Sequence, residues 1–261
     1  MRGYSPQTVR SYSIALKALL NHHETEKRGG VTYINIMPLR LAMASLSKKT
    51  ISARLSAIRS FVEYLNSYQE QKLKLQGDQS VKVPKSLPKP IEDKNIKEVI
   101  KRCTLEERVI ITMLYALGLR ISELASLKVL DISESWVRVF GKGAKVREVP
   151  LLTSVASLIF EYKKLQNPTT YLFEKDGNAI TASQLRYRVQ KAFKRQGIKA
   201  TPHQLRHAFA TELLKDGARI SDVSELLGHG SMATTQVYTK LTSATKLQNY
   251  LKAHPLTRII Q

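Results

Sequence analysis

Cysteine is almost absent from this sequence, since Cys103 is the single cysteine among 261 residues. One cysteine excludes an internal disulfide framework and a zinc site built from several thiolates. No apolar run approaches the roughly 18 residues that a membrane-spanning helix needs, and no signal peptide is recognisable at the start of the chain. These absences predict a soluble, intracellular protein that does not enter a membrane.

Acidic side chains are scarce relative to basic ones. Aspartate and glutamate number 21 against 42 lysines and arginines, which gives a formal net charge of +21. The excess is not a basic tail, because basic residues outnumber acidic ones both before and after residue 87. A positive surplus in both parts of a folded chain indicates a polyanionic partner, and nucleic acid is the polyanion we expect. The alternative is a basic protein that is merely soluble.

Three prolines mark a break in the chain, at Pro84, Pro88 and Pro90. Proline resists both helix and sheet, and the residues around these prolines show little apolar periodicity. The pattern predicts an extended linker over residues 73–90. We therefore expect an N-terminal domain over residues 1–72 and a second domain over residues 91–261.

Before the linker, apolar residues repeat with the period of amphipathic helices. One stripe follows Ser5-Pro6 and another follows Ser47, and serine is a favoured N-cap. We expect a small helical bundle in this domain. Cations without an acid among them lie off the second stripe, and they either form a solvated face or face nucleic-acid phosphates. These candidates for nucleic-acid binding are Lys48, Lys49, Arg54 and Arg59.

After the linker, helical periodicity dominates and is interrupted once. Helices are expected near residues 92–102, 104–117, 121–127, 153–166, 181–196, 202–215, 220–227 and 243–252. β-branched and aromatic residues on both sides of Gly141-Lys142-Gly143 instead predict a β-hairpin with glycines at its turn. The predicted fold class is mainly α-helical, with a small antiparallel β-hairpin in the second domain.

The stretch TPHQLRHAFATELL at residues 201–214 places His203 and His207 one turn apart on one helix face. Zinc hydrolases use such a pair, but they carry a glutamate general base where this chain has Gln204. Arg206 in the same turn would repel a divalent cation, and no cluster with ligand spacing follows. A phosphate suits the pattern better, because Arg206 offers a bidentate fork and His203 near the helix N-terminus can move a proton. We therefore expect no metal and no cofactor.

Three further stretches carry residues that suit phosphate chemistry. Arg120 stands in ALGLRISELASL between two apolar helices, and Lys142 stands between two glycines that permit close backbone approach. His229 also lies between two glycines, in LGHGSMATTQVYTKL, nine residues before Tyr238. Taken singly, each has an ordinary alternative as a snorkelling surface arginine, an exposed turn lysine or a space-filling tyrosine.

Together these stretches resemble the tyrosine recombinase family, and within it the Xer-like recombinases. The matching motifs are GLRxSEL, GKGxKxRxVP, HxLRH, LGH and TTxxYTK, in that order over residues 116–241. The resemblance implies an N-terminal SAM-like core-binding domain and a C-terminal catalytic domain that close round double-stranded DNA as a C-shaped clamp. It further implies a homodimer on one site, a tetramer in synapsis and a cytoplasmic, nucleoid-associated enzyme that needs neither metal nor ATP.

The resemblance also implies a role for each matching residue. The catalytic set is Arg120, Lys142, His203, Arg206, His229 and Tyr238. Tyr238 would attack the scissile phosphodiester, form a 3′-phosphotyrosyl bond and release a 5′-hydroxyl. The two arginines would clamp the nonbridging oxygens, His203 would act as the base, His229 would donate to the phosphoryl oxygens, and Lys142 would protonate the leaving 5′-oxygen.

Four nearby residues receive secondary interpretations. Lys145 and Arg147 follow Lys142 in the same motif and are further candidates for DNA contacts. Glu123 lies one turn after Arg120 and either orients it or pairs with it on the surface. His207 is interpreted as a buried structural partner.

The resemblance leaves the biological task open. Strand exchange through a Holliday junction would serve chromosome dimer resolution in an Xer-like enzyme, and the same chemistry would serve the integrase or transposase of a mobile element. A type IB topoisomerase would use related chemistry to relax DNA without a defined site. A catalytically inactive DNA-binding protein is a further alternative, but competent residues occupy all six catalytic positions.

Overall fold

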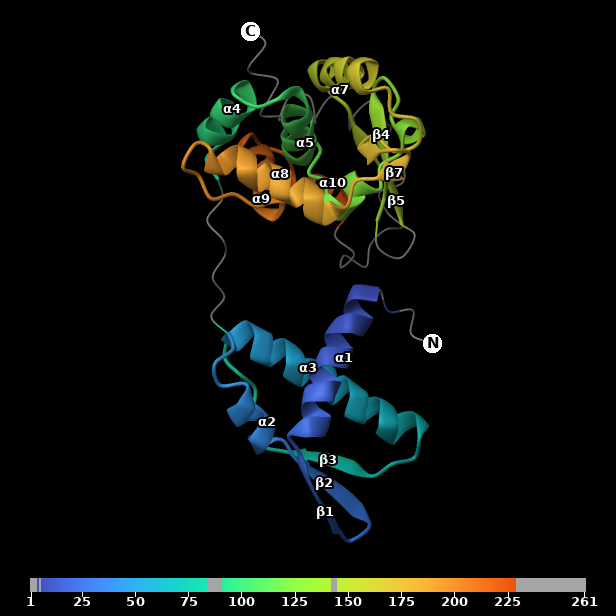
Figure 1. Cartoon of the computed structure of the whole chain (residues 1–261), viewed down its shortest axis with the longest axis vertical. Helices are drawn as coiled ribbons and strands as arrows, with labels where there is room; N and C mark the ends of the chain where they lie inside the picture. The colour runs from blue at the N-terminus through green and yellow to red at the C-terminus, as the bar shows by residue number, and fades with distance from the viewer. Residues whose placement is uncertain (1–3, 5, 84–90, 142–144, 229–261) are drawn as a thin grey trace. The chain divides into compact units, whose positions relative to one another are not determined.

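The computed structural model describes residues 4, 6–83, 91–141 and 145–228 of the chain (Figure 1). The chain divides into two compact units, residues 1–87 and residues 88–261. The helices within the described ranges are all too short or too polar to cross a membrane.

The first unit combines helices with a small sheet. Its described helices are α1 (Pro6–Asn21), α2 (Met37–Ala42) and α3 (Lys48–Tyr68). Strand β1 (Glu24–Arg28) pairs with β2 (Val31–Asn35) in antiparallel fashion, and β3 (Leu73–Gln76) joins β2 in parallel. The core lies between the sheet and the helices and is formed by Leu19, Ile34, Ile36, Leu39, Met43, Leu55, Ile58 and Val62.

The sheet corrects two expectations for this part of the chain. The first unit is not a purely helical bundle, and residues 73–76, which the sequence placed in the linker, form β3. The sequence signal was weak because every residue of β1 is exposed, so β1 shows no apolar alternation. In β3 only Leu73 and Leu75 face the core, and their partner strand lies far away in the sequence.

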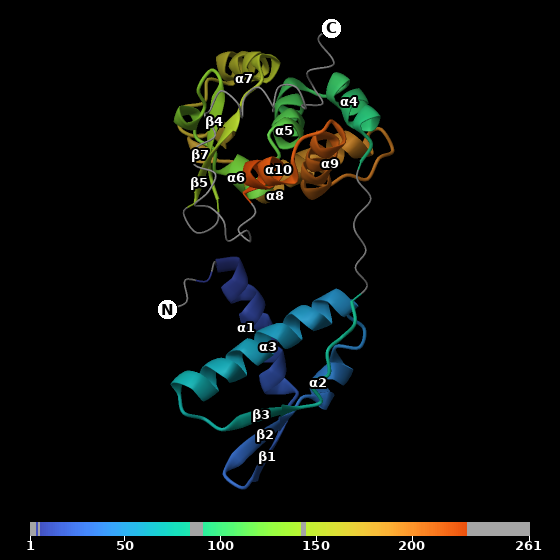
Figure 2. The ribbon, with the colours of Figure 1, turned by 180° about the vertical axis from the view of Figure 1, so that it is seen from behind.

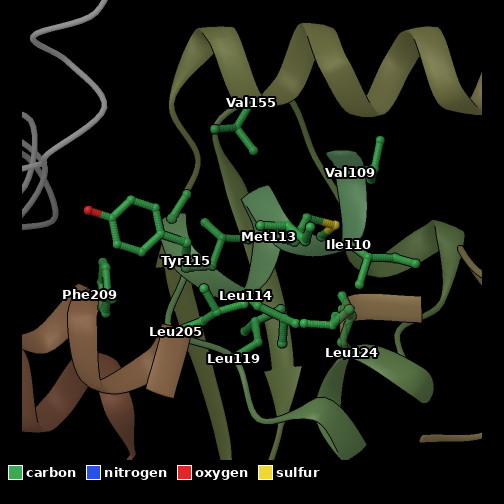
Figure 3. Packing of buried hydrophobic residues seen from close by; sticks show 14 of the residues in the cluster. Val109, Ile110, Met113, Leu114, Tyr115, Leu119, Leu124, Val155, Leu205 and Phe209 are labelled. Atoms are coloured by element: carbon green, nitrogen blue, oxygen red, sulfur yellow. The ribbon is translucent and has the colours of Figure 1, made fainter. Parts of the chain in front are cut away.

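The second unit is built round one buried helix, α5 (Leu105–Ala116). Val109–Ala116 of this helix are buried without interruption. Figure 3 shows side chains of α5 packed between α7, which carries Val155, and α9, which carries Leu205 and Phe209. The surrounding described helices are α4 (Asp93–Lys101), α6 (Ile121–Ala125), α7 (Thr153–Gln166), α8 (Ala182–Lys194), α9 (Pro202–Lys215) and α10 (Ile220–Leu227).

The expected hairpin and the mainly helical fold class are confirmed. Strands β4 (Trp136–Phe140) and β5 (Val146–Pro150) pair in antiparallel register, with Val139 opposite Arg147. Three short elements were not expected from the sequence: the 3-10 turn η1 (Val129–Asp131) and the strand pair β6 (Glu174–Lys175) and β7 (Asn178–Ala179). The expected helix near residues 243–252 lies outside the described residues.

Threonine caps fix the starts of the helices that carry or support the site. Thr104 caps α5, Thr181 caps α8 and Thr201 caps α9, each accepting a hydrogen bond from a backbone N–H in the first turn. At α9 the cap is followed by Pro202, the first residue of the helix. The start expected from the sequence for α9 is confirmed, and Figure 2 shows this helix beside α10.

Candidate active site

Arg120 is positioned by a tight turn between α5 and α6. Gly118 adopts the left-handed conformation, with φ of +58°, and Leu119 is fully buried. Arg120 then forms the N-cap of α6. Its Nη1 donates to Glu123 Oε1 at 2.7 Å and its Nη2 donates to the Gly228 carbonyl at 3.3 Å. With 39% of its side chain exposed, Arg120 is held at two points and still open to solvent.

We expect Gly118→Ala to destabilise the second unit strongly. An added Cβ would lie 2.5 Å from Phe209 Cδ1, inside the core, and the positive φ disfavours any L side chain. Strain and overpacking together predict a loss of about 3 kcal/mol, or roughly 6–12 °C in melting temperature. The matched control is Gly197→Ala, where φ is +70° but nothing lies within 4 Å of the new Cβ, so only the strain remains. Equal losses in thermal denaturation would show that packing at Gly118 is unimportant.

Arg206 lies on the inner face of α9, with only 5% of its surface exposed. Its Nη1 donates to the Gly118 carbonyl at 2.6 Å and its Nη2 donates to the Leu227 carbonyl at 2.6 Å. Burial, followed by the neighbouring positive charge of Arg120, lowers the pKa of Arg206 to about 10. The guanidinium is therefore still protonated at neutral pH, although its charge is poorly solvated. A negatively charged ligand would stabilise it.

Glu123 is the acidic centre of the site, and its side chain is only 4% exposed. Both oxygens accept from Arg120, through the backbone N–H at 2.8 Å and Nη1 at 2.7 Å. Burial raises the pKa of Glu123, but hydrogen bonds from Arg147 and Arg120, together with the charge of Arg147, outweigh burial and hold the pKa below its usual range. Because Glu123 is buried, its contact with Arg120 is not a surface ion pair. That Glu123 orients Arg120 for catalysis stays a prediction.

Arg147 corrects an expectation. The sequence placed it among the DNA contacts, but its side chain is 12% exposed and forms a bidentate pair with Glu123, at 3.0 Å and 2.7 Å. Its Nε also donates to the Leu226 carbonyl at 2.8 Å. The physical reason is the alternation of β5, which turns Arg147 toward the same side as buried Val149.

Arg120, Arg147 and Arg206 all donate hydrogen bonds to carbonyl oxygens at the C-terminus of α10. The last carbonyls of a helix lack intrahelical partners and carry partial negative charge, so cations bind there. Gly228 ends α10 in the left-handed conformation, and His229 is the next residue of the sequence. The bonds run from Arg147 Nε to the Leu226 oxygen, from Arg206 Nη2 to the Leu227 oxygen and from Arg120 Nη2 to the Gly228 oxygen. Three cations and one carboxylate thus lie at the end of this helix, which leaves a net positive site.

His203 is exposed in the first turn of α9, three residues before Arg206. His207 is half-buried, and Thr211 donates to its carbonyl. Three catalytic candidates, Lys142, His229 and Tyr238, lie outside the described residues. The structure therefore brings Arg120, Arg206 and Glu123 together, and it places His203 on the helix of Arg206.

The other DNA-binding candidates divide into two groups. Lys48, Lys49 and Lys145 are exposed, and Arg54 is half-buried. Arg59 is instead bound to both carboxylate oxygens of Asp78 at 2.9 Å and 2.8 Å. That ion pair ties α3 to the chain beyond β3, which corrects the expectation that Arg59 faces phosphate.

In the parts of the chain that the structure covers, no three His, Cys, Asp or Glu side chains gather as metal ligands would. The polar groups that converge here are arginine N–H donors, helix carbonyls and one carboxylate. Groups of this chemistry would suit an oxyanion, since the bidentate geometry of guanidinium matches phosphate oxygens.

Comparison with known proteins identifies relatives along the whole chain. Residues 89–245 match the Phage integrase family, and residues 1–69 match the Phage integrase N-terminal SAM-like domain. Tyrosine recombinase XerA of Thermococcus onnurineus is 33% identical over 273 residues, covering 100% of this chain and 93% of that protein. Tyrosine recombinase XerC of Escherichia coli is 32% identical over 278 residues, covering 97% and 92%.

Solved structures share the fold. The crystal structure of XerA recombinase aligns with a TM-score of 0.53 at 24% identity and covers 95% of this chain and 92% of that chain. A lambda integrase tetramer bound to a Holliday junction aligns with a TM-score of 0.70 at 16% identity, covering 89% and 74%. At these identities the likeness concerns the fold alone.

Proposed function

This chain belongs to the Phage integrase family, the tyrosine recombinases, and on that premise we propose that it cuts and rejoins double-stranded DNA with Tyr238 as its nucleophile. The protein is an enzyme that catalyses site-specific recombination.

The pairing of Arg120 with Arg206 is the observation that carries the proposal. The two guanidinium groups come from different helices and meet at the end of α10. Burial and, after it, repulsion by the positive charge of Arg120 lower the pKa of Arg206. A phosphodiester placed between them would relieve that repulsion, and the relief would grow as negative charge builds on the nonbridging oxygens in the transition state.

The reaction balances without metal or ATP. The Tyr238 oxygen forms a bond to phosphorus while the bond from phosphorus to the 5′-oxygen breaks. His203 accepts the phenolic proton, and Lys142 supplies a proton to the departing 5′-oxygen. His229 donates a hydrogen bond to a phosphoryl oxygen beside the two arginines. The phosphotyrosyl bond conserves the energy of the broken linkage, so a 5′-hydroxyl of the partner strand can reverse the step.

The relatives support the assembly and the task that we propose. The matched relatives named XerA and XerC align over almost their full length, and for this Xer-like chain we propose chromosome dimer resolution in the cytoplasm, with a mobile-element role as the alternative. The lambda integrase structure is a tetramer bound to a Holliday junction. For this chain we propose a dimer on one site and a tetramer in synapsis. The N-terminal SAM-like unit would hold DNA together with the catalytic unit, through cations such as Lys48 and Lys49.

Sequencing the DNA that becomes covalently attached to the protein in its native host tests the proposal. After a denaturing wash in high salt, the recovered fragments should share one recurring sequence whose broken strand ends at the attachment point. Fragments of unrelated sequence would indicate a topoisomerase that relaxes DNA without a defined site. Absence of covalent fragments would indicate a catalytically inactive DNA-binding protein.

A further inference from the structure

Arg147 occupies an unusual place for an arginine. It is the second residue of β5, opposite Val139, on the side of the hairpin that faces the core. A buried cation is stable only when its N–H groups are bonded and its charge is balanced. The neighbouring arginine of the same hairpin, Arg138 on β4, has 58% of its side chain exposed and pairs with exposed Glu148. The two arginines of the hairpin therefore differ in burial: Arg147 faces the core, whereas Arg138 faces solvent.

The bonds of Arg147 join three separate elements. The bidentate pair reaches Glu123 in α6, and the Nε bond reaches Leu226 in the last turn of α10. The close fit extends to Gly228, where an added Cβ would lie 3.1 Å from Arg147 Nη1. The Arg147 guanidinium thus connects the β4–β5 hairpin with α6, which begins after Arg120, and with the end of α10.

Arg147 also shares a carboxylate with Arg120. Oε1 of Glu123 accepts from Nη1 of both arginines, and Oε2 accepts from the Arg120 backbone and from Arg147 Nη2. Without Arg147, the buried carboxylate would have Arg120 as its only cationic partner among these contacts. It would then bind the Arg120 side chain more tightly and compete with phosphate for its N–H groups. The net charge of the cluster would also fall by one.

Resting on the function proposed above, we propose that Arg147 is a positioning residue, which shares the charge of Glu123 and thereby leaves the Arg120 guanidinium available to the scissile phosphate. Arg147 does not touch DNA in this account. Its contribution acts through Arg120 and depends on the negative charge of the phosphate. A purely structural contribution would be independent of that charge.

The test compares two substrates. One is a nicked duplex that carries the DNA site recovered by covalent capture, and the other has one nonbridging oxygen of the scissile phosphate replaced by a methyl group. The methylphosphonate is neutral, so it gains less from cationic groups. On the normal phosphate, Arg147→Gln should form the covalent complex about 10- to 100-fold more slowly than wild type, the range that is typical when a residue that orients a metal ligand is removed. On the methylphosphonate the difference should shrink to about threefold or less.

Matched variants make the comparison decisive. Arg138→Gln removes the outward arginine of the same hairpin and should cleave both substrates like wild type. Arg120→Ala should show the same shrinking difference as Arg147→Gln, and adding Arg147→Gln to Arg120→Ala should cost little more. Should Arg147→Gln fail to fold, as judged by circular dichroism, Arg147→Lys is measured in its place, because lysine keeps the charge but loses the fork.

Two results would overturn the inference. An equal slowing on both substrates would make Arg147 a structural residue, and normal rates on the phosphate would remove any role. Either result leaves the proposed function intact, provided that wild type forms its covalent complex with the captured site. Failure of wild type itself to form that complex would instead contradict the proposed function.

Discussion

Tyr238→Phe should bind the recombination site with unchanged affinity and never become covalently attached to it. The substitution keeps the ring and removes only the oxygen that forms the bond to phosphorus. A phenol with a pKa of about 10 is ionised in about one part in a thousand at neutral pH, so wild type depends on a base and on polarised phosphorus. Neither can act when the nucleophile is absent, and the expected loss of covalent complex is complete.

Denaturing electrophoresis of a labelled, nicked substrate measures the covalent complex, and a mobility shift in native gels measures binding. The sequence holds 11 tyrosines, so a matched control is needed. Tyr187→Phe alters an exposed tyrosine on α8 and should form the complex at the wild-type rate. A covalent product from Tyr238→Phe would show that another side chain attacks, and peptide mapping of the adduct would identify it.

Much of the helical fold could be predicted because several helices begin at a clear local signal, although α2, which has no side-chain cap, was missed. Thr201-Pro202 marks the start of α9, and Thr104 marks the start of α5 with Glu107 completing a capping box. The hairpin of β4 and β5 follows from alternating apolar residues beside glycine. Elements without such signals were missed. Strand β1 has five exposed residues, and β3 depends on a parallel partner that local patterns do not reveal.

The partners of basic side chains could not be predicted from charge patterns. Arg59 and Arg147 stood in basic stretches and were interpreted as phosphate contacts, yet each is bound to a carboxylate from another part of the chain. Asp78 lies 19 residues from Arg59, and Glu123 lies 24 residues from Arg147. For Arg147 a signal did exist, because it stands two residues before Val149 on an alternating strand and so shares its buried face.

Arg120 and Arg206 were paired only through the family resemblance. Their spacing in the sequence shows nothing of their proximity, which arises because α9 packs on α5 and both arginines reach the end of α10. Gly118 contributes to the position of both arginines. Its carbonyl accepts a hydrogen bond from Arg206, and its left-handed conformation forms the turn that precedes Arg120. The contacts of such a buried polar network depend on how the helices pack in three dimensions. Local residue patterns do not reveal that packing, so the contacts could not be predicted from them.

Lys142→Ala should slow cleavage of the normal phosphodiester by about 10²–10⁴-fold, the usual cost of removing a general acid. The 5′-oxygen leaves as an alkoxide unless it receives a proton, and an alkoxide is a poor leaving group. A thiolate needs no such proton, because its conjugate acid is much stronger. Replacing the bridging 5′-oxygen by sulfur should therefore restore cleavage to Lys142→Ala, measured as the rate of covalent complex formation on the two substrates.

Two other variants show whether the rescue is specific to the leaving group. Tyr238→Phe should stay inactive on the sulfur substrate, since it lacks the attacking oxygen. Arg206→Ala should stay slow, because its guanidinium acts on the nonbridging oxygens, which sulfur at the bridge does not replace. If sulfur fails to rescue Lys142→Ala, the lysine is not the acid. His203 and His229 would then be tested with the same pair of substrates, since the acid is the residue whose removal sulfur offsets.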